Sequence, residues 1–139
     1  MLTLFAFLLT LGILITLHEY GHYRVAVACG VKVMRFSIGF GRPVYTWRPA
    51  RQRYGQDTEF VIGLIPLGGY VQMLDASDGE LETADLSRAF NRQPLRARVA
   101  IVAAGPAANL LLAVVLLAAL RVDKILGSSL GCDVGAKGL

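Results

Sequence analysis

Two long apolar runs constrain the fold of this chain more than any other feature of its sequence. The first extends from Leu2 to Leu17 and continues toward Ala28, and the second extends from Val99 to Leu120. Each approaches the roughly 20 residues that an α-helix needs to cross a bilayer. Charged residues make up only 17% of the chain, whereas soluble domains carry about a quarter. The runs therefore predict an α-helical integral membrane protein with two transmembrane helices.

The basic residues indicate how these helices are oriented. Of the 14 Lys and Arg residues, 11 lie between Leu17 and Val99, and none precedes the first run. Lys and Arg near the ends of spans mark the cytoplasmic side of a membrane. We therefore expect a cytoplasmic middle segment and extracytoplasmic termini. Because topology accounts for the net charge of +4, we expect no nucleic-acid binding.

The segment between the runs has the pattern of a small membrane-associated β region. Apolar and small residues alternate from Phe36 to Gly41, which is typical of a strand. Further β-prone stretches follow, and we expect four short strands at about 36–40, 44–47, 59–65 and 70–74.

These patterns divide the chain into four parts. Gly30 is a suitable stop for the first helix, and Pro94 can open the second. The glycine-rich chain after Leu120 is expected to lack regular structure. The predicted parts are a transmembrane helix at 1–28, a cytoplasmic-side β region and loop at 29–93, a second transmembrane helix at 94–121 and an extracytoplasmic tail at 122–139.

One motif near the end of the first helix carries recognisable chemistry. His18, Glu19 and His22 form the pattern H-E-x-x-H. Residues four apart share one face of a helix, so two imidazoles there can hold one Zn²⁺. A glutamate beside the first ligand can take a proton from zinc-bound water, whose pKa the metal lowers. The motif predicts zinc ligands at His18 and His22 and a catalytic base at Glu19.

A chance match on a solvated helix face is the alternative explanation of this motif. Two facts favour zinc binding. His18 and His22 are the only histidines in the chain. Ionisable groups within a span are costly and by default indicate function. At 1.5 Å per residue, His18 lies roughly 25 Å from Leu2, near the cytoplasmic face of the membrane.

Several separated motifs, in the same order, resemble the site-2 protease family of intramembrane zinc metalloproteases. The resemblance covers roughly residues 11–120. It rests on the zinc motif and on the segments Arg35–Gly41, Leu64–Val71, Met73–Asp75, Ala89–Asn91 and Ala103–Asn109.

The resemblance implies a function and further site residues. The function is hydrolysis of peptide bonds in or near transmembrane segments of single-span proteins, such as anti-sigma factors or leftover signal peptides, at a bacterial inner membrane. Asn109 would hold substrate or stabilise the reacting carbonyl, although an interhelical hydrogen bond is an alternative role. Gly68 and Gly69 would lie in a strand that pairs with extended substrate, although turn or bulge chemistry explains them equally well.

One departure from the family concerns the third zinc ligand. The family takes it from an aspartate of a Leu-Asp-Gly motif in a later helix, and the sequence has no such motif. Asp75 follows Leu74 but lies in the β region, so we do not expect it to be a ligand. We therefore expect an incomplete fragment that binds zinc weakly and does not cleave by itself. Two other functions stay open: a non-catalytic zinc-binding membrane protein, and a truncated paralogue that binds substrate without cutting.

Overall fold

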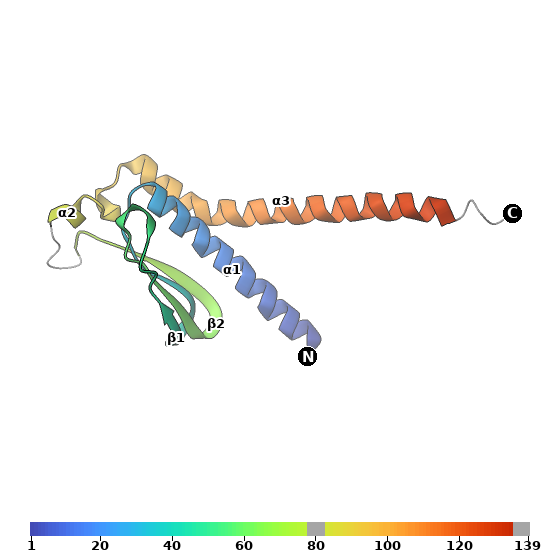
Figure 1. Ribbon diagram of the computed structural model, residues 1–139, viewed down its shortest axis with the longest axis horizontal. Helices are drawn as coiled ribbons and strands as arrows, with labels where there is room; N and C mark the ends of the chain where they lie inside the picture. Colours follow the sequence, from blue (N-terminus) through green and yellow to red (C-terminus); the bar gives the residue numbers. More distant parts are fainter. Residues whose placement is uncertain (78–82, 135–139) are drawn as a thin grey trace. The chain divides into compact units, whose positions relative to one another are not determined.

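The computed structural model describes residues 1–77 and 83–134 (Figure 1). The chain divides into two compact units, Met1–Ala108 and Asn109–Leu139. The first unit holds helix α1, strands β1 and β2 and the beginning of helix α3, and the second continues α3. Two long helices with a small β region between them are therefore present, as the sequence predicts.

Helix α1 spans Leu2–Ala28, which are the bounds expected from the sequence. Its end is a glycine-terminated cap. Gly30 has a φ of 82°, and its amide donates to the carbonyl of Val27 while the amide of Val31 donates to that of Ala26, at 3.1 and 3.0 Å. These two bonds satisfy carbonyls that the helix end would otherwise leave unpaired.

The β region consists of two antiparallel strands, β1 (Val33–Trp47) and β2 (Glu59–Met73). In each strand, some residues pair with two different segments of the other strand. Ile38, for example, is opposite both Ile62 and Gly69. The four short strands expected from the sequence are thus halves of two bent strands. Residues with left-handed φ, including Gly39, Gly41 and Gly68, let each strand bend without ending.

A small core joins the end of α1, the start of β1 and the start of α3. Its fully buried members are Ala26, Val31, Val33 and Ile101. Buried polar groups beside this core are also paired. The Gln56 side chain accepts a hydrogen bond from the amide of Val33 and donates to the carbonyl of Val31, at 2.9 and 2.8 Å. This core holds together the end of α1, which carries the zinc motif, the start of β1 and the start of α3.

Two short helical segments, α2 (Thr83–Leu86) and η2 (Phe90–Arg92), lead into α3, which spans Leu95–Val134. The expectation that the chain lacks regular structure after Leu120 is therefore wrong. Only glycines, not prolines, interrupt the favourable sequence there, and a glycine costs a helix about 1 kcal/mol, which does not end it.

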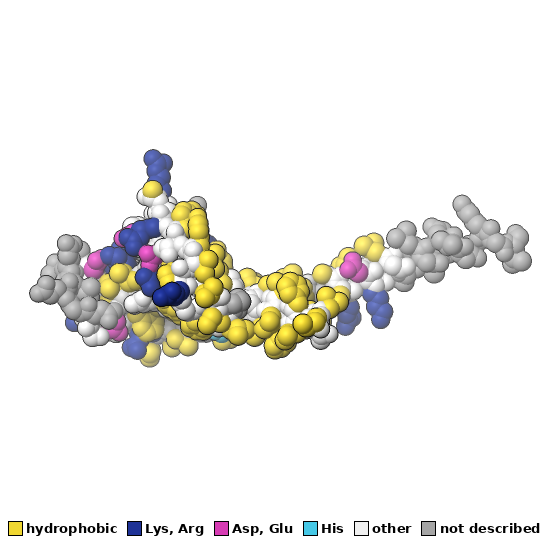
Figure 2. Space-filling model, turned by 90° about the horizontal axis from the view of Figure 1, so that it is seen from below, with side chains coloured by type: hydrophobic (Ala, Val, Ile, Leu, Met, Phe, Trp, Pro, Cys, Tyr) yellow, Lys and Arg dark blue, Asp and Glu magenta, His cyan; other side chains and the backbone are white. Residues whose placement is uncertain are grey.

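Both long helices meet the length and composition of a membrane span. They do so over Leu2–Ala28 and over Leu95–Gly127. Figure 2 shows hydrophobic side chains along the surface of α3, and Lys and Arg side chains both on the unit that contains the sheet and farther along α3.

Candidate metal centre

The zinc motif lies within the last three turns of α1, where His18 and His22 share one face. Their ring centroids are 4.8 Å apart, and the ring planes are nearly perpendicular at 80°. Both residues are half-buried. This is the arrangement that the four-residue spacing predicts for two imidazoles on successive turns.

Gly105 of α3 lies directly opposite the two imidazoles. A Cβ atom placed on Gly105 would lie 2.7 Å from Nε2 of His18. It would also collide with Nε2 of His22. Both Nε2 atoms therefore converge on one point beside the α3 backbone, and that point is free of side-chain atoms only because residue 105 is a glycine.

The other ring nitrogen of His22 is already engaged. Its Nδ1 lies 2.7 Å from the carbonyl oxygen of Ile101. A carbonyl can only accept a hydrogen bond, so Nδ1 carries the proton and Nε2 keeps its lone pair for a metal. The Ile101 side chain is 1% exposed within the core. The core therefore holds the carbonyl that orients His22.

These observations fit a zinc ion bound by Nε2 of His18 and Nε2 of His22. Imidazole nitrogen is a preferred zinc donor, and bound histidines commonly donate their second ring N–H to a carbonyl. Gly105 and Ile101 were not predicted from the sequence to be parts of the site. Gly105 comes directly before Pro106 inside an apolar run. By itself, this pair indicates only a bend in the helix.

Gly21, inside the motif, serves a different purpose from the one its position suggests. A glycine there would be expected to leave room near the metal. Instead, a Cβ at Gly21 would lie 2.5 Å from the carbonyl oxygen of Ala104 and 2.9 Å from Cβ of Ala108. The backbone of α3 occupies the space beside Gly21, because close helix contacts require small residues on both sides.

Glu19 lies beside the two histidines and close to the sheet. It lines a cavity of about 320 Å³ together with His22 and Val102. Its Cγ is 3.3 Å from where a Cβ of Gly69 would be, and the carbonyl of Ser37 is closer still, at 2.8 Å. The glycine thus lets β2 approach the carboxylate-bearing side chain of α1.

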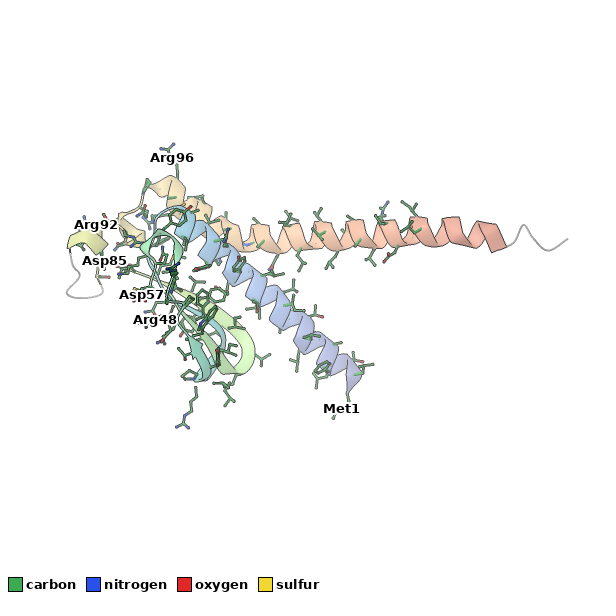
Figure 3. The ribbon with its side chains drawn as sticks, viewed as in Figure 1. Met1, Arg48, Asp57, Asp85, Arg92 and Arg96 are labelled. Atoms are coloured by element: carbon green, nitrogen blue, oxygen red, sulfur yellow. The ribbon has the colours of Figure 1, made fainter. Side chains whose placement is uncertain are left out.

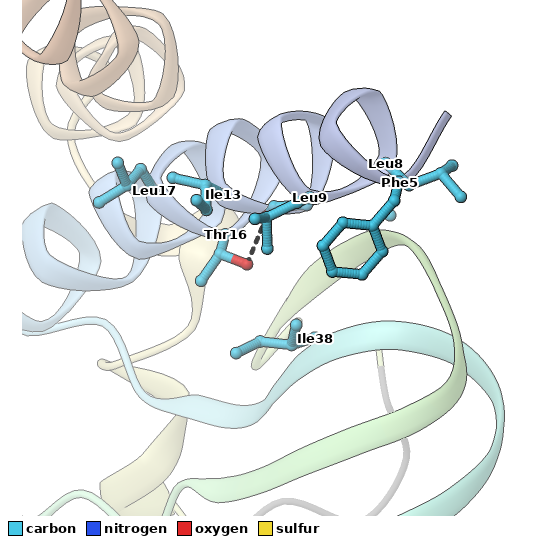
Figure 4. Close-up of a pocket in the computed structure, with 9 residues that line it drawn as sticks. Phe5, Leu8, Leu9, Ile13, Thr16, Leu17 and Ile38 are labelled. Carbon is cyan, nitrogen blue, oxygen red and sulfur yellow. Dashed lines mark hydrogen bonds between the residues drawn. The ribbon is translucent and has the colours of Figure 1, made fainter. Parts of the chain in front are cut away.

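Gly68 lies at the edge of a second, apolar groove. A groove of about 600 Å³ runs between α1 and the sheet, and its walls include Phe5, Leu9, Ile13 and Ile38 (Figure 4). The φ of Gly68 is 118°, and a Cβ there would collide with the ring of Phe40. Gly68 and Gly69, predicted to bind substrate, are therefore both next to α1.

Asn109 lies in α3, four residues after Gly105, at the beginning of the second unit. Its role in substrate binding stays a prediction.

Asp75 has partners of its own. Its Oδ1 accepts hydrogen bonds from the amide of Ser77 at 2.9 Å and from the side chain of Asn91 at 2.8 Å. The hydroxyl and amide of Ser77 hold the pKa of Asp75 below its ordinary value. Across residues 1–77 and 83–134 no group of three His, Cys, Asp or Glu side chains could hold a metal. The two histidines thus form a half-site within the described chain.

Comparisons with known proteins agree with this geometry. Residues 6–131 match the model of peptidase family M50. The chain is 54% identical over 110 residues, 79% of its length, to a protein of Xylella fastidiosa named "Putative zinc metalloprotease". It is 52% identical over 109 residues, 78% of its length, to "Regulator of sigma-E protease RseP" of Salmonella typhimurium. These matches cover 24% and 23% of the relatives, so the chain spans about a quarter of the length of the curated relatives it matches.

Proposed function

Because this chain belongs to peptidase family M50, the site-2 proteases, we propose that it carries the zinc-binding half-site of an intramembrane protease. The observation that carries this proposal is the convergence of Nε2 of His18 and Nε2 of His22 beside Gly105. The third ligand is an aspartate outside the described residues, as the family resemblance implies.

Two membrane-spanning helices are part of this proposal. The apolar stretches of α1 and α3 are long enough to cross a bilayer, and they expose large hydrophobic side chains that include Phe5, Phe7, Leu110 and Leu117. Such exposure is favourable in lipid and unfavourable in water. The basic residues between the spans support a sheet on the cytoplasmic side of a bacterial inner membrane, with both termini outside.

The chemistry follows from the positions of the side chains. His18 and His22 would hold the zinc ion, which would supply Lewis-acid chemistry toward the scissile carbonyl and the attacking water. Glu19 accepts a proton from the attacking water and delivers it to the leaving amine. Its cavity, shared with His22, admits water to an otherwise apolar region. The Ile101 carbonyl keeps His22 in the tautomer that leaves Nε2 available.

The substrate is an extended segment of a single-span membrane protein. Residues 69–73 of β2 pair with β1 on one side, and Gly69 on this strand is close to Glu19. A substrate strand can add along such an edge through backbone hydrogen bonds. The apolar groove beside Gly68 suits the hydrophobic residues of a transmembrane segment. The name of the Salmonella relative supports a substrate of the anti-sigma factor type. Leftover signal peptides are the second proposed class of substrate.

Asn109 is the one polar side chain proposed for substrate binding from α3. Replacing Asn109 with Ala is expected to raise KM or lower kcat without loss of bound zinc. A packing role alone would instead lower thermal stability and leave both kinetic constants unchanged.

Two variants of the intact protein, purified in detergent, test the function. With a single-span membrane protein as substrate, Glu19→Gln is expected to abolish cleavage while zinc stays bound, and His18→Ala is expected to remove both. Cleavage that survives Glu19→Gln contradicts the role of Glu19 as the catalytic base. A function that Glu19→Gln leaves unchanged and His18→Ala abolishes favours a zinc-binding membrane protein without catalysis. Substrate that co-purifies with the wild type and is never cut identifies a non-cleaving paralogue.

A further inference from the structure

A pocket of about 340 Å³ lies between the last turns of α1 and the loop that joins β1 to β2. It is separate from the zinc motif. Two arginines line it, Arg24 of α1 and Arg51 of the loop, together with the aromatic rings of Trp47, Tyr54 and Phe60. None of the described residues around it is acidic. We refer to it as the arginine pocket.

The two guanidinium groups carry unneutralised charge. The ion pairs of the described residues involve Lys32, Arg35 and Arg48, and none involves Arg24 or Arg51. Arg24 lies 5.9 Å from the ring of Tyr20, an aromatic contact that leaves its charge in place. Two arginines without a carboxylate make a site for an anion, and planar guanidinium groups bind phosphate oxygens in pairs.

The loop that forms one wall is held in a fixed conformation. The Gln52 side chain exchanges two hydrogen bonds with the backbone of Thr58, both 2.8 Å long. The Arg88 guanidinium donates to the carbonyls of Tyr54 and Gly55 at 3.0 and 3.1 Å. Two of these contacts lie within the loop and two come from Arg88, which follows α2, so the wall of the pocket is preorganised.

These hydrogen bonds hold the backbone of Tyr54 in an unusual conformation. Its φ is 60° and its ψ is 28°, in the left-handed region that a tyrosine rarely occupies. Its side chain is nevertheless 73% exposed, so packing of the ring does not compensate for this conformation. A bulky residue in such a backbone conformation, with an exposed ring beside two arginines, is typical of a binding site.

The position of the pocket along α1 indicates the source of the anion. From Leu2 to Arg24 the helix rises about 33 Å, which is slightly more than the roughly 30 Å of bilayer hydrocarbon. Arg24 then lies at the level of the lipid headgroups, where Trp and Tyr side chains are also enriched. This step rests on the membrane-spanning α1 of the proposed function.

We propose that the arginine pocket binds an anionic phospholipid, with Arg24 and Arg51 on its phosphate and Trp47 and Tyr54 against its glycerol and upper acyl chains. The bound lipid would hold the loop and the end of α1 at the membrane surface. The zinc ligands lie on the same last turns of α1, so the lipid also fixes their depth in the bilayer.

Native mass spectrometry of the protein in detergent tests this site with two probes, phosphatidylglycerol and phosphatidylcholine. The wild type is expected to bind phosphatidylglycerol about 25-fold more tightly, since each basic residue near an anionic surface contributes a factor of about five. Arg24→Gln combined with Arg51→Gln should abolish this preference. Arg51→Gln alone, at an exposed position that the fold tolerates, should reduce it about fivefold.

Arg48→Gln is the matched control. Arg48 is on the same hairpin but pairs with Asp57 and Glu59 at 3.8 and 3.7 Å (Figure 3), so its replacement should leave the preference unchanged. Equal affinity of the wild type for the two lipids overturns the proposal. So does displacement of phosphatidylglycerol by millimolar inorganic phosphate, which would indicate a general anion site. Zinc content of the same samples separates these outcomes from a failure of the proposed protease.

Discussion

A single methyl group at Gly105 is expected to remove zinc from the candidate metal centre. The substitution Gly105→Ala adds one carbon atom on the face of α3 where Nε2 of His18 and Nε2 of His22 converge. Alanine is favoured over glycine in a helix interior by about 1 kcal/mol. Any loss of zinc would therefore come from the collision, not from a weaker helix.

The size of the effect follows from two distances. The added carbon would lie 2.7 Å from Nε2 of His18, whereas ordinary contact begins at 3.4 Å, so this nitrogen must retreat by 0.7 Å, the difference between the two. Zinc–nitrogen distances in proteins hold to within about 0.2 Å. Changes to groups that only orient ligands already cost about 10-fold to 100-fold in affinity. We expect a loss of zinc affinity at the upper end of this range, about 100-fold or 2.7 kcal/mol.

Competition with a chromophoric zinc chelator, in the protein purified in detergent, measures this affinity. Gly127→Ala is the matched control, because it lies in the same helix and an added Cβ there has no atom within 4 Å. Thermal unfolding of both metal-free variants shows whether the fold is intact. If the Gly105→Ala protein folds and binds zinc as tightly as the Gly127→Ala protein, the inferred position of the metal is wrong.

Three further predictions concern the surroundings of the site. Gly21→Ala forces α3 away from α1 and should cost about 1–3 kcal/mol in thermal stability; unchanged stability would show that the helices do not pack at this point. Gln56→Ala leaves the amide of Val33 buried without its partner and should cost about 2 kcal/mol in denaturant unfolding, whereas Gln52→Ala, at a less buried position, should cost less. Asp75 has a folded-state pKa below its ordinary value of 3.8, so its stabilising contribution is present above that pH and is lost as the pH falls through the lower folded-state value. Removing the hydroxyl donor with Ser77→Ala should therefore lower the melting temperature at neutral pH and have no effect in strong acid, and a pH-independent difference would contradict this origin.

Local signals in the sequence were sufficient to predict α1 and its end. The apolar run sets the length of the helix, and Gly30 supplies the left-handed residue that ends it. The family resemblance is also confirmed, because it rested on several separated motifs. The strands were harder to predict, because Gly41 and Gly68 lie in the gaps between the short strands expected from the sequence. In the structure these glycines are bends within continuous strands, and only pairing between distant segments distinguishes the two.

The candidate site shows the same division between local and distant information. The spacing of His18 and His22 predicts two imidazoles on one face of a helix, and the structure has the two rings there. The hydrogen bond from His22 to Ile101 connects residues 79 apart in sequence, and no periodicity within one helix predicts which carbonyl of another will meet an imidazole. The length of α3 beyond Leu120 was underestimated for a different reason, since a few glycines weaken a helix without ending it.

The two glycines at the contact between α1 and the start of α3 explain how the half-site is built. Gly21 admits the backbone of α3 at Ala104 and Ala108, and Gly105 admits the two imidazoles of α1. The contact at Gly105 depends on the contact at Gly21, because α3 can reach the imidazoles only if no side chain projects from Gly21. A side chain at Gly21 would therefore weaken zinc binding indirectly, by moving the Ile101 carbonyl away from His22. The motif H-E-x-x-H supplies the two imidazoles, but the tautomer of His22 and the space beside both Nε2 atoms come from α3.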